Sequence, residues 1–177
     1  TEGRPAVEQI VILPDGLLAD EAALLALTAS AQQGSEHPLA HAVLQAAAEQ
    51  GLALQSVSEF NSLPGRGLSA QVDGRMWLVG NRRLMQEQQI DMAPLEVMAD
   101  AAEQQGKTLM WVARKDDQLG RLAGFIAVSD PIKPEALDAV EELKRRGLEV
   151  VMLTGDNRHA AGLVARQVGI ERVVAEV

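Results

Sequence analysis

The pattern of apolar and polar residues divides the chain into three parts, and the first part predicts one strand and two helices. Residues 7–13 alternate as a strand does and end at a Pro-Asp-Gly turn. Asp20 is placed to cap a helix that runs to about Gln33 with one apolar face. A second, alanine-rich helix is predicted from Pro38, a residue that suits a first helical turn, to Gln50.

The middle of the chain is predicted to be rich in strands. Its candidate strands share apolar residues between glycine or polar turns, and they are 55–60, 68–72, 75–79, 108–113 and 119–128. The Asp73-Gly74 pair between two of them is a strong hairpin signal. Asn81 is placed to cap a short helix through Glu87, and residues 93–105 predict another helix. The expected fold of residues 7–125 is therefore α+β, an antiparallel sheet flanked by helices.

From Pro134 the pattern is typical of a parallel α/β fold. An amphipathic helix begins there, and its residues expected to face inward are Leu137, Val140 and Leu143. A buried strand at 148–153, a helix at 158–168 and a strand at 172–177 follow. Strand, helix and strand with tight loops form half of a doubly wound, Rossmann-like sheet. Because so few elements cannot cover both faces of such a sheet, we expect this part to be truncated.

Composition excludes several functions. The chain has 177 residues, a formal net charge of −9 and no cysteine, so it has no disulfide, thiolate metal site or cysteine nucleophile. An acidic chain is a poor partner for nucleic acid, which requires a basic face. Two Phe, two Trp and no Tyr also leave little aromatic surface for stacking single strands. We expect an acidic, intracellular-type domain or a part of a larger protein.

Thr154-Gly155-Asp156-Asn157 directly follows a predicted strand and is the sharpest candidate site. Ligands bind at the carboxyl ends of strands in open α/β sheets, where a hydroxyl and the N-terminus of the next helix can receive phosphate oxygens. The Asp156 carboxylate can reach a ribose hydroxyl or a bound Mg²⁺. Alternatively, Asp156 or Asn157 only caps the next helix.

Three loops in the α+β part are further candidates. Ser35–Pro38 presents the flat imidazole of His37 before a proline, which suits a purine or simply starts a helix. Pro64–Gly67 is a glycine loop in which backbone can approach a ligand, or an ordinary turn. At 79–81 the asparagine contacts a ligand or caps a helix. His41 lies one helical turn after His37, but no third ligand accompanies the pair, so we expect no metal site.

Other conspicuous residues are predicted to be structural. Arg82 and Arg83 are expected on a solvated helix face, and Trp77 and Trp111 in the core or on a face of the sheet. Asp130–Pro134 holds two prolines and is expected to be a stiff connector.

Taken in order, Glu-His-Pro, Gly-x-Gly, Gly-Asn, Asp-Pro-x-Lys and Thr-Gly-Asp resemble the cytosolic ATP-binding region of heavy-metal-transporting P-type ATPases, most of all the Cu(I)/Ag(I) exporters. The likeness covers essentially the whole chain. Thr1-Glu2-Gly3 is similar to the residues after the family's Asp-Lys-Thr-Gly-Thr phosphorylation motif, and Val177 falls before its Gly-Asp-Gly-x-Asn-Asp loop. The resemblance implies a nucleotide-binding domain at 7–125, inserted between pieces 1–6 and 126–177 of a haloacid-dehalogenase-like phosphorylation domain.

The resemblance also assigns roles around the nucleotide. His37 would orient and stack near adenine, with Glu36 and Pro38 beside it in the motif. Gly65 and Gly67 would let the backbone pack against the nucleotide.

The remaining roles come from the same likeness. Asn81 would contact the nucleotide with Gly80 beside it, Thr154 would receive the transferred phosphoryl group, and Asp156 would help to place the nucleotide. Gln32 stands where the family often has a glutamate that accepts a hydrogen bond from the adenine amino group. Its neutral amide is expected to weaken that bond by about 1 kcal/mol.

The implied function is ATP binding, with Mg²⁺ on the nucleotide, at the cytoplasmic face of a membrane. The phosphoryl group would pass to an aspartate outside this chain and drive copper or silver export. The implied partners are the membrane and actuator domains of the same pump, with no nucleic acid, and the fragment would be a monomer that binds ATP without turnover. The alternatives are a zinc or cadmium pump, a stand-alone phosphatase and a non-catalytic interaction module. A stand-alone phosphatase requires a nucleophilic aspartate in an Asp-x-Asp or Asp-x-Thr setting, and none precedes Val7.

Overall fold

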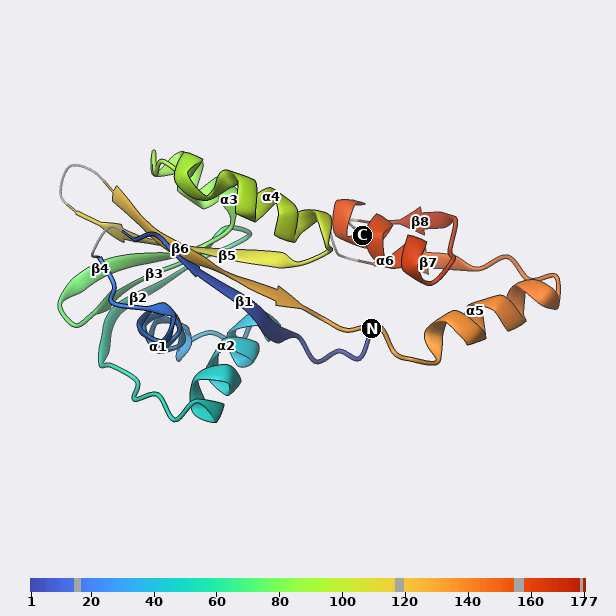
Figure 1. The fold of residues 1–177 in the computed structure, drawn as a ribbon, viewed down its shortest axis with the longest axis horizontal. Helices are drawn as coiled ribbons and strands as arrows, with labels where there is room; N and C mark the ends of the chain where they lie inside the picture. Colours follow the sequence, from blue (N-terminus) through green and yellow to red (C-terminus); the bar gives the residue numbers. More distant parts are fainter. Residues whose placement is uncertain (15–16, 117–119, 155–157, 176) are drawn as a thin grey trace.

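The structure is a computed structural model that describes residues 1–14, 17–116, 120–154, 158–175 and 177 (Figure 1). A six-stranded antiparallel sheet has the order β1-β6-β5-β4-β3-β2. Its strands are β1 (Ala6–Ile12), β2 (Val57–Leu63), β3 (Gly67–Val72), β4 (Arg75–Gly80), β5 (Thr108–Lys115) and β6 (Gly120–Ser129). The predicted α+β architecture is confirmed, although β2 begins two residues later than expected.

Local sequence signals fix several junctions of this sheet. Asp73 and Gly74 have φ values of 49° and 72°, so both residues of the β3–β4 turn are left-handed, as a tight hairpin requires. The β5–β6 hairpin extends further than predicted, because Arg114 and Lys115, expected in a turn, pair with Arg121 and Gly120.

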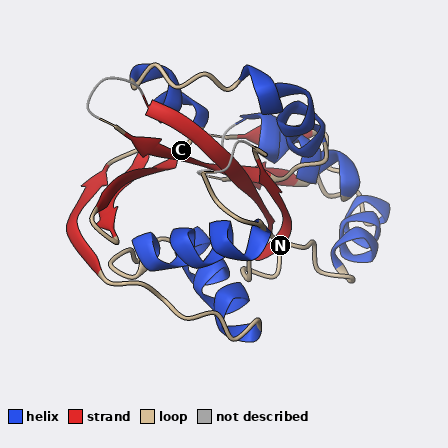
Figure 2. Ribbon diagram, turned by 60° about the vertical axis from the view of Figure 1, so that its left-hand side comes forward, coloured by secondary structure: helices blue, strands red, loops and turns tan. Residues whose placement is uncertain are grey.

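Helices cover both faces of the sheet (Figure 2). One face packs on α1 (Glu21–Gln32) and α2 (Pro38–Glu49), the other on α3 (Arg82–Glu87) and α4 (Glu96–Gln104). The helix predicted at 93–105 is divided into a 3₁₀ turn at Ala93–Leu95 and α4. Asp20 caps α1 by accepting a hydrogen bond from the Ala23 N–H at 2.8 Å, as predicted. Two apolar cores result, one under each helix pair.

The C-terminal part holds α5 (Ala136–Arg145), β7 (Val151–Leu153), α6 (Arg158–Gln167) and β8 (Arg172–Val174). The parallel pairing of β7 with β8 is confirmed. The predicted burial is wrong for Leu137 and Leu143, which are exposed, and for Leu153, which is 70% exposed. The amphipathic pattern identifies an apolar face correctly, but a two-stranded sheet offers too little surface to cover it.

Contacts between described residues join the two parts near the N-terminus and at the α4–β5 turn. Near the N-terminus, the Glu2 N–H donates to the Pro131 carbonyl at 2.9 Å, and the Arg4 N–H donates to the Asp130 carboxylate at 3.1 Å. The first two residues of the connector, Asp130 and Pro131, therefore lie beside the first residues of the chain. At the α4–β5 turn, a Cβ on Gly106 would lie 3.6 Å from Leu163 of α6. No helix in the described ranges is long and apolar enough to cross a bilayer.

Candidate functional site

Asn81 joins the glycine loop to helix α3. Its side-chain oxygen accepts a hydrogen bond from the Leu84 N–H at 3.0 Å, which caps α3, and its Nδ2 donates to the Gly65 carbonyl at 2.9 Å. The Asn81 N–H also donates to the Arg66 carbonyl at 2.8 Å. The predicted capping role is confirmed, and the same side chain holds the loop between β2 and β3.

Gly67 and Gly80 face each other across β3 and β4. A Cβ on Gly67 would lie 2.1 Å from the Val79 carbonyl oxygen, and a Cβ on Gly80 would lie 2.2 Å from the Arg66 carbonyl oxygen. No side chain fits at either position, because protein backbone occupies the space. Gly65 differs: its φ is 70°, and nothing lies within 4 Å of an added Cβ. Of the three glycines, Gly65 has open space beside it for a ligand.

His37 lies at the N-terminus of α2 with its side chain exposed. Its Nδ1 accepts a hydrogen bond from the Leu39 N–H at 3.2 Å, so the histidine is the N-cap and Pro38 occupies the first turn. Because Nδ1 accepts, a neutral ring carries its proton on Nε2 and presents a donor there. The structural role of His37 is thus present and still leaves the ring face accessible.

Gln32 is the last residue of α1 and is only 6% exposed. Its Nε2 donates a long hydrogen bond to the Met110 sulfur at 3.6 Å, and among the described residues its Oε1 has no partner. A thioether is a weak acceptor, and an unpaired buried oxygen costs about 1–3 kcal/mol. The amide is therefore poorly satisfied by the protein.

Two of the predicted nucleotide contacts, Gln32 and Gly80, are linked through β5 at the end of the sheet where β4 ends. Gly80 pairs with Trp111, and the neighbouring Met110 contacts Gln32, so α1, β4 and β5 meet there. The loop that leads to His37 lies against β2, since a Cβ on Gly34 would lie 3.5 Å from the Phe60 ring. The sequence did not predict that Phe60 would lie against this loop, because β2 has too few apolar side chains to show which of its faces is covered.

Thr154 lies away from the predicted nucleotide contacts of the six-stranded sheet. Its N–H donates to the Val174 carbonyl at 3.0 Å, so it belongs to the β7–β8 unit, which lies at the opposite end of the molecule from β2 and β3 (Figure 1). Asp156, the other predicted residue of this motif, lies outside the described residues.

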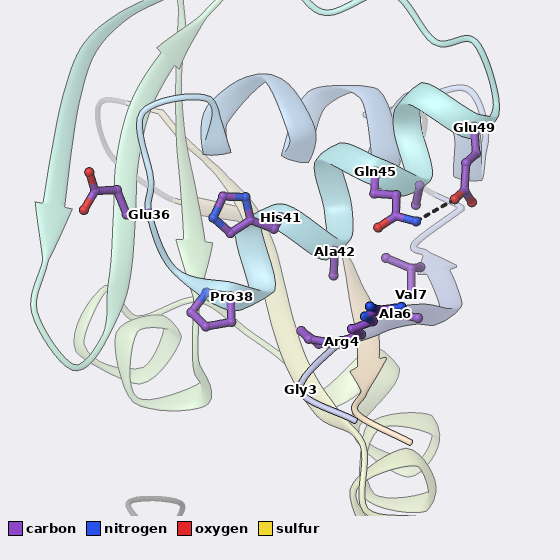
Figure 3. Close-up of a pocket in the computed structure, with 12 residues that line it drawn as sticks. Gly3, Arg4, Ala6, Val7, Glu36, Pro38, His41, Ala42, Gln45 and Glu49 are labelled. Carbon is purple, nitrogen blue, oxygen red and sulfur yellow. Dashed lines mark hydrogen bonds between the residues drawn. The ribbon is translucent and has the colours of Figure 1, made fainter. Parts of the chain in front are cut away.

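A groove of about 600 Å³ separates the N-terminal residues 3–7 from α2 (Figure 3). Of the predicted site residues that the structure describes, only Glu36 and Pro38 line it. His41 also lines the groove, and at its far end Gln45 donates a hydrogen bond to Glu49 at 2.8 Å. In the parts of the chain that the structure describes, no three His, Asp or Glu side chains are grouped to hold a metal ion.

The environment of Arg82 differs from the solvated helix face that the sequence predicts. It forms ion pairs with Glu96, Asp100 and Glu103 of α4, and its guanidinium lies 5.5 Å from the centre of the Trp111 ring. Partial burial lowers the pKa of Arg82, but the hydrogen bond to Glu103 and the three carboxylate charges outweigh it and raise that pKa above its usual value. Arg83 does lie on a solvated face, where it pairs with Glu87 at 3.0 Å.

Comparison with known proteins decides the family. The profile of the haloacid dehalogenase-like hydrolases matches residues 1–177. The chain belongs to this hydrolase family. Among curated relatives of this haloacid dehalogenase-like chain, the silver exporting P-type ATPase of Salmonella typhimurium is 42% identical and the copper-exporting P-type ATPase of Legionella pneumophila is 43% identical, each over 177 residues. The match covers 100% of this chain but only 21% and 23% of those relatives, so the chain spans about a fifth of their length.

Solved structures agree on the fold of this haloacid dehalogenase-like chain. A zinc-transporting PIB-type ATPase in its E2.Pi state superposes with a TM-score of 0.73 and 31% identity, over 99% of this chain and 27% of that one. The N-domain of HMA8, a copper-transporting P-type ATPase, matches with a TM-score of 0.57 and 23% identity, over 70% of this chain and 99% of that domain. The resemblance to P-type ATPases and the predicted fold class are confirmed.

Proposed function

We propose that this chain is the ATP-binding cytosolic region of a P-type ATPase that exports copper or silver. The observation that carries the proposal is the identity of 42–43% to silver- and copper-exporting relatives along all 177 residues. We assign nucleotide binding to residues 7–125 and assign 1–6 and 126–177 to the phosphorylation domain.

The geometry at the end of the six-stranded sheet fits a purine nucleotide. An exposed imidazole with a free Nε2–H offers a flat face and a donor at His37. Gly65 leaves its backbone open to close approach, and the buried Gln32 amide has an acceptor that an amino group of the base can satisfy once the side chain turns. Glu36 and Pro38 complete the turn that carries the imidazole.

The proposed chemistry is phosphoryl transfer, which depends on positioning and charge neutralisation. Mg²⁺ arrives with the nucleotide and neutralises charge on the phosphates. In this proposal the chain binds the base near His37 and Gln32. Bending of the connector at 130–134 then brings the γ-phosphate toward Thr154 and Asp156. The acceptor aspartate lies outside the chain, so we expect the chain to bind ATP without hydrolysing it.

Titration of the chain with a non-hydrolysable ATP analogue and Mg²⁺, followed by NMR, tests the nucleotide site. We expect chemical shift changes at residues 32–38, 65–67 and 80–81. Saturating analogue that leaves all three segments unchanged would contradict the proposed site.

Two substitutions test whether the imidazole of His37 binds the nucleotide, independently of its role as the N-cap of α2. His37→Asn keeps a good N-cap but removes the imidazole, so the melting temperature should stay the same while affinity falls about tenfold. The control is His41→Gln, an exposed histidine on the same helix, and its affinity should stay within twofold of the wild type. Equal affinities for the wild type and His37→Asn would show that the imidazole does not touch the nucleotide.

The identity of the cargo requires the full-length pump. ATP hydrolysis by the purified pump in detergent should rise with Cu(I) or Ag(I) and not with Zn²⁺. Stimulation by Zn²⁺ alone would replace copper export with the zinc alternative while leaving the nucleotide site intact.

A further inference from the structure

We propose that Arg82 is a positioning residue for the nucleotide site, acting through Asn81 and the glycine loop; this inference rests on the proposed function. Sequence reasoning assigned Arg82 to a solvated face. The structure instead surrounds its guanidinium with three carboxylates and an aromatic ring.

The contacts of Arg82 join three elements. Its guanidinium pairs with Glu96, with Asp100 at 3.0 Å and with Glu103 at 2.9 Å, all on α4. These acids are four and three residues apart, so they share one face of that helix. The same guanidinium lies over the ring of the fully buried Trp111 in β5, a cation–π geometry. Arg82 therefore joins the first turn of α3 to α4 and to the sheet.

Helix α3 needs such an attachment. It has six residues, too few to be stable as an isolated helix, and only Leu84 and Met85 of its side chains are buried. Without Arg82, three carboxylates on one face of α4 would lose their shared cation. Their mutual repulsion would then act at the junction between α3 and α4.

The glycine loop is attached to both ends of α3. At its start, Asn81 donates to the Gly65 carbonyl at 2.9 Å and caps the helix at Leu84. At its end, Glu87 pairs with Arg66 at 3.2 Å. A shift of α3 would therefore move the loop whose open side lies at Gly65.

A second route leads to the same place. Trp111, the residue under the guanidinium, pairs across β4 and β5 with Gly80, whose own backbone contacts Arg66 and Gly67. Arg82 is thus connected to the glycine loop both through α3 and through Trp111 and Gly80 of the sheet. The ion pairs and the ring contact that the structure gives its guanidinium involve none of the predicted nucleotide contacts, so Arg82 is a positioning residue.

The test measures affinity of the 177-residue chain for Mg²⁺ and a non-hydrolysable ATP analogue by calorimetry, well below the melting temperature of each variant. We expect Arg82→Met to bind about fivefold more weakly, about 1 kcal/mol. Arg83→Met, at the neighbouring arginine that pairs with Glu87 alone among the described residues, is the matched control and should keep the wild-type affinity. Absence of binding by the wild type would refute the proposed function, whereas wild-type affinity in folded Arg82→Met would refute only the role of Arg82.

A double-mutant cycle tests the route. Because Arg82 acts in part through Asn81, Arg82→Met combined with Asn81→Ala should weaken binding by less than the sum of the two single losses. Additive losses would overturn the proposed route. Arg82→Lys should recover part of the affinity, since lysine restores the charge but not the fork of donors. If Arg82→Met does not fold, Glu103→Gln removes one carboxylate partner and should weaken binding about twofold; wild-type affinity in that variant would also overturn the proposal.

Discussion

Replacing Gly67 with alanine should be far more damaging than replacing Gly65, although both lie in the same loop. At Gly67 an added Cβ would lie 2.1 Å from a backbone carbonyl oxygen, and φ is 141°, a conformation that side chains avoid. The strained conformation costs about 1–3 kcal/mol and the forced shift of packed backbone a similar amount. We therefore expect Gly67→Ala to lower the free energy of unfolding by about 3 kcal/mol.

Gly65→Ala is the matched control. Its φ of 70° also lies in the left-handed region, but an added Cβ meets no atom within 4 Å. Only the backbone cost of about 1 kcal/mol applies. The difference between the two variants therefore reports the contact between the backbones of β3 and β4 together with the rarer backbone conformation of Gly67.

Urea denaturation followed by tryptophan fluorescence measures both variants. Trp77 and Trp111, the two tryptophans of the sequence, lie in the six-stranded sheet, so the signal reports that unit and not the β7–β8 part. With a slope near 2 kcal/mol/M, the midpoint should fall by about 1.5 M for Gly67→Ala and about 0.5 M for Gly65→Ala. Equal midpoints for the two variants would refute the argument that backbone contact dictates glycine at Gly67.

Two further predictions concern stability. Leu24→Ala, at a position 0% exposed, should lower the free energy of unfolding by about 2–5 kcal/mol in the same denaturation assay. Leu153→Ala, 70% exposed, should change it by less than about 0.5 kcal/mol in urea denaturation followed by far-UV circular dichroism, which also reports the β7–β8 part. The hydrogen bond from Arg114, with help from nearby arginines, holds the pKa of the Asp116 carboxyl below its usual value although slight desolvation opposes it. Because the pKa of Asp116 is lower in the folded than in the unfolded state, its ionised form stabilises the fold fully above about pH 4, and this stabilisation is lost as the pH falls further. The free energy of unfolding of Asp116→Asn should therefore fall less than that of the wild type between about pH 4 and pH 2.

Short-range signals in the sequence predicted the local structure well. Asp73-Gly74 specified the hairpin, and Asp20 and Asn81 capped the predicted helices, because each signal acts over two to four residues. The parallel pairing of β7 and β8 was also predictable from strand, helix and strand in succession.

Features that depend on distant partners were not predictable. Gly67 must be glycine because the backbone of Val79 and Gly80 occupies the space of a side chain. The ion-pair partners of Arg82 lie 14 to 21 residues further along the chain. A helical pattern at 136–145 identifies an apolar face but not whether another layer covers it. The expected burial of Leu137 failed for this reason.

Asn81 lies where the β2–β3 loop meets the start of α3, and its hydrogen bonds to both limit how it can bind a nucleotide. Its amide has two donors and two acceptor lone pairs, and one of each is already used, on Gly65 and on the Leu84 N–H. A nucleotide that bonds to Asn81 must use the remaining donor or lone pair without displacing the first two bonds. Because those bonds fix the open side of Gly65, loss of the Asn81 side chain disturbs the loop whether or not the nucleotide touches it. Affinity lost in an Asn81 variant therefore measures the loop as well as the contact, which is why the double-mutant cycle with Arg82 is more informative than the single substitution.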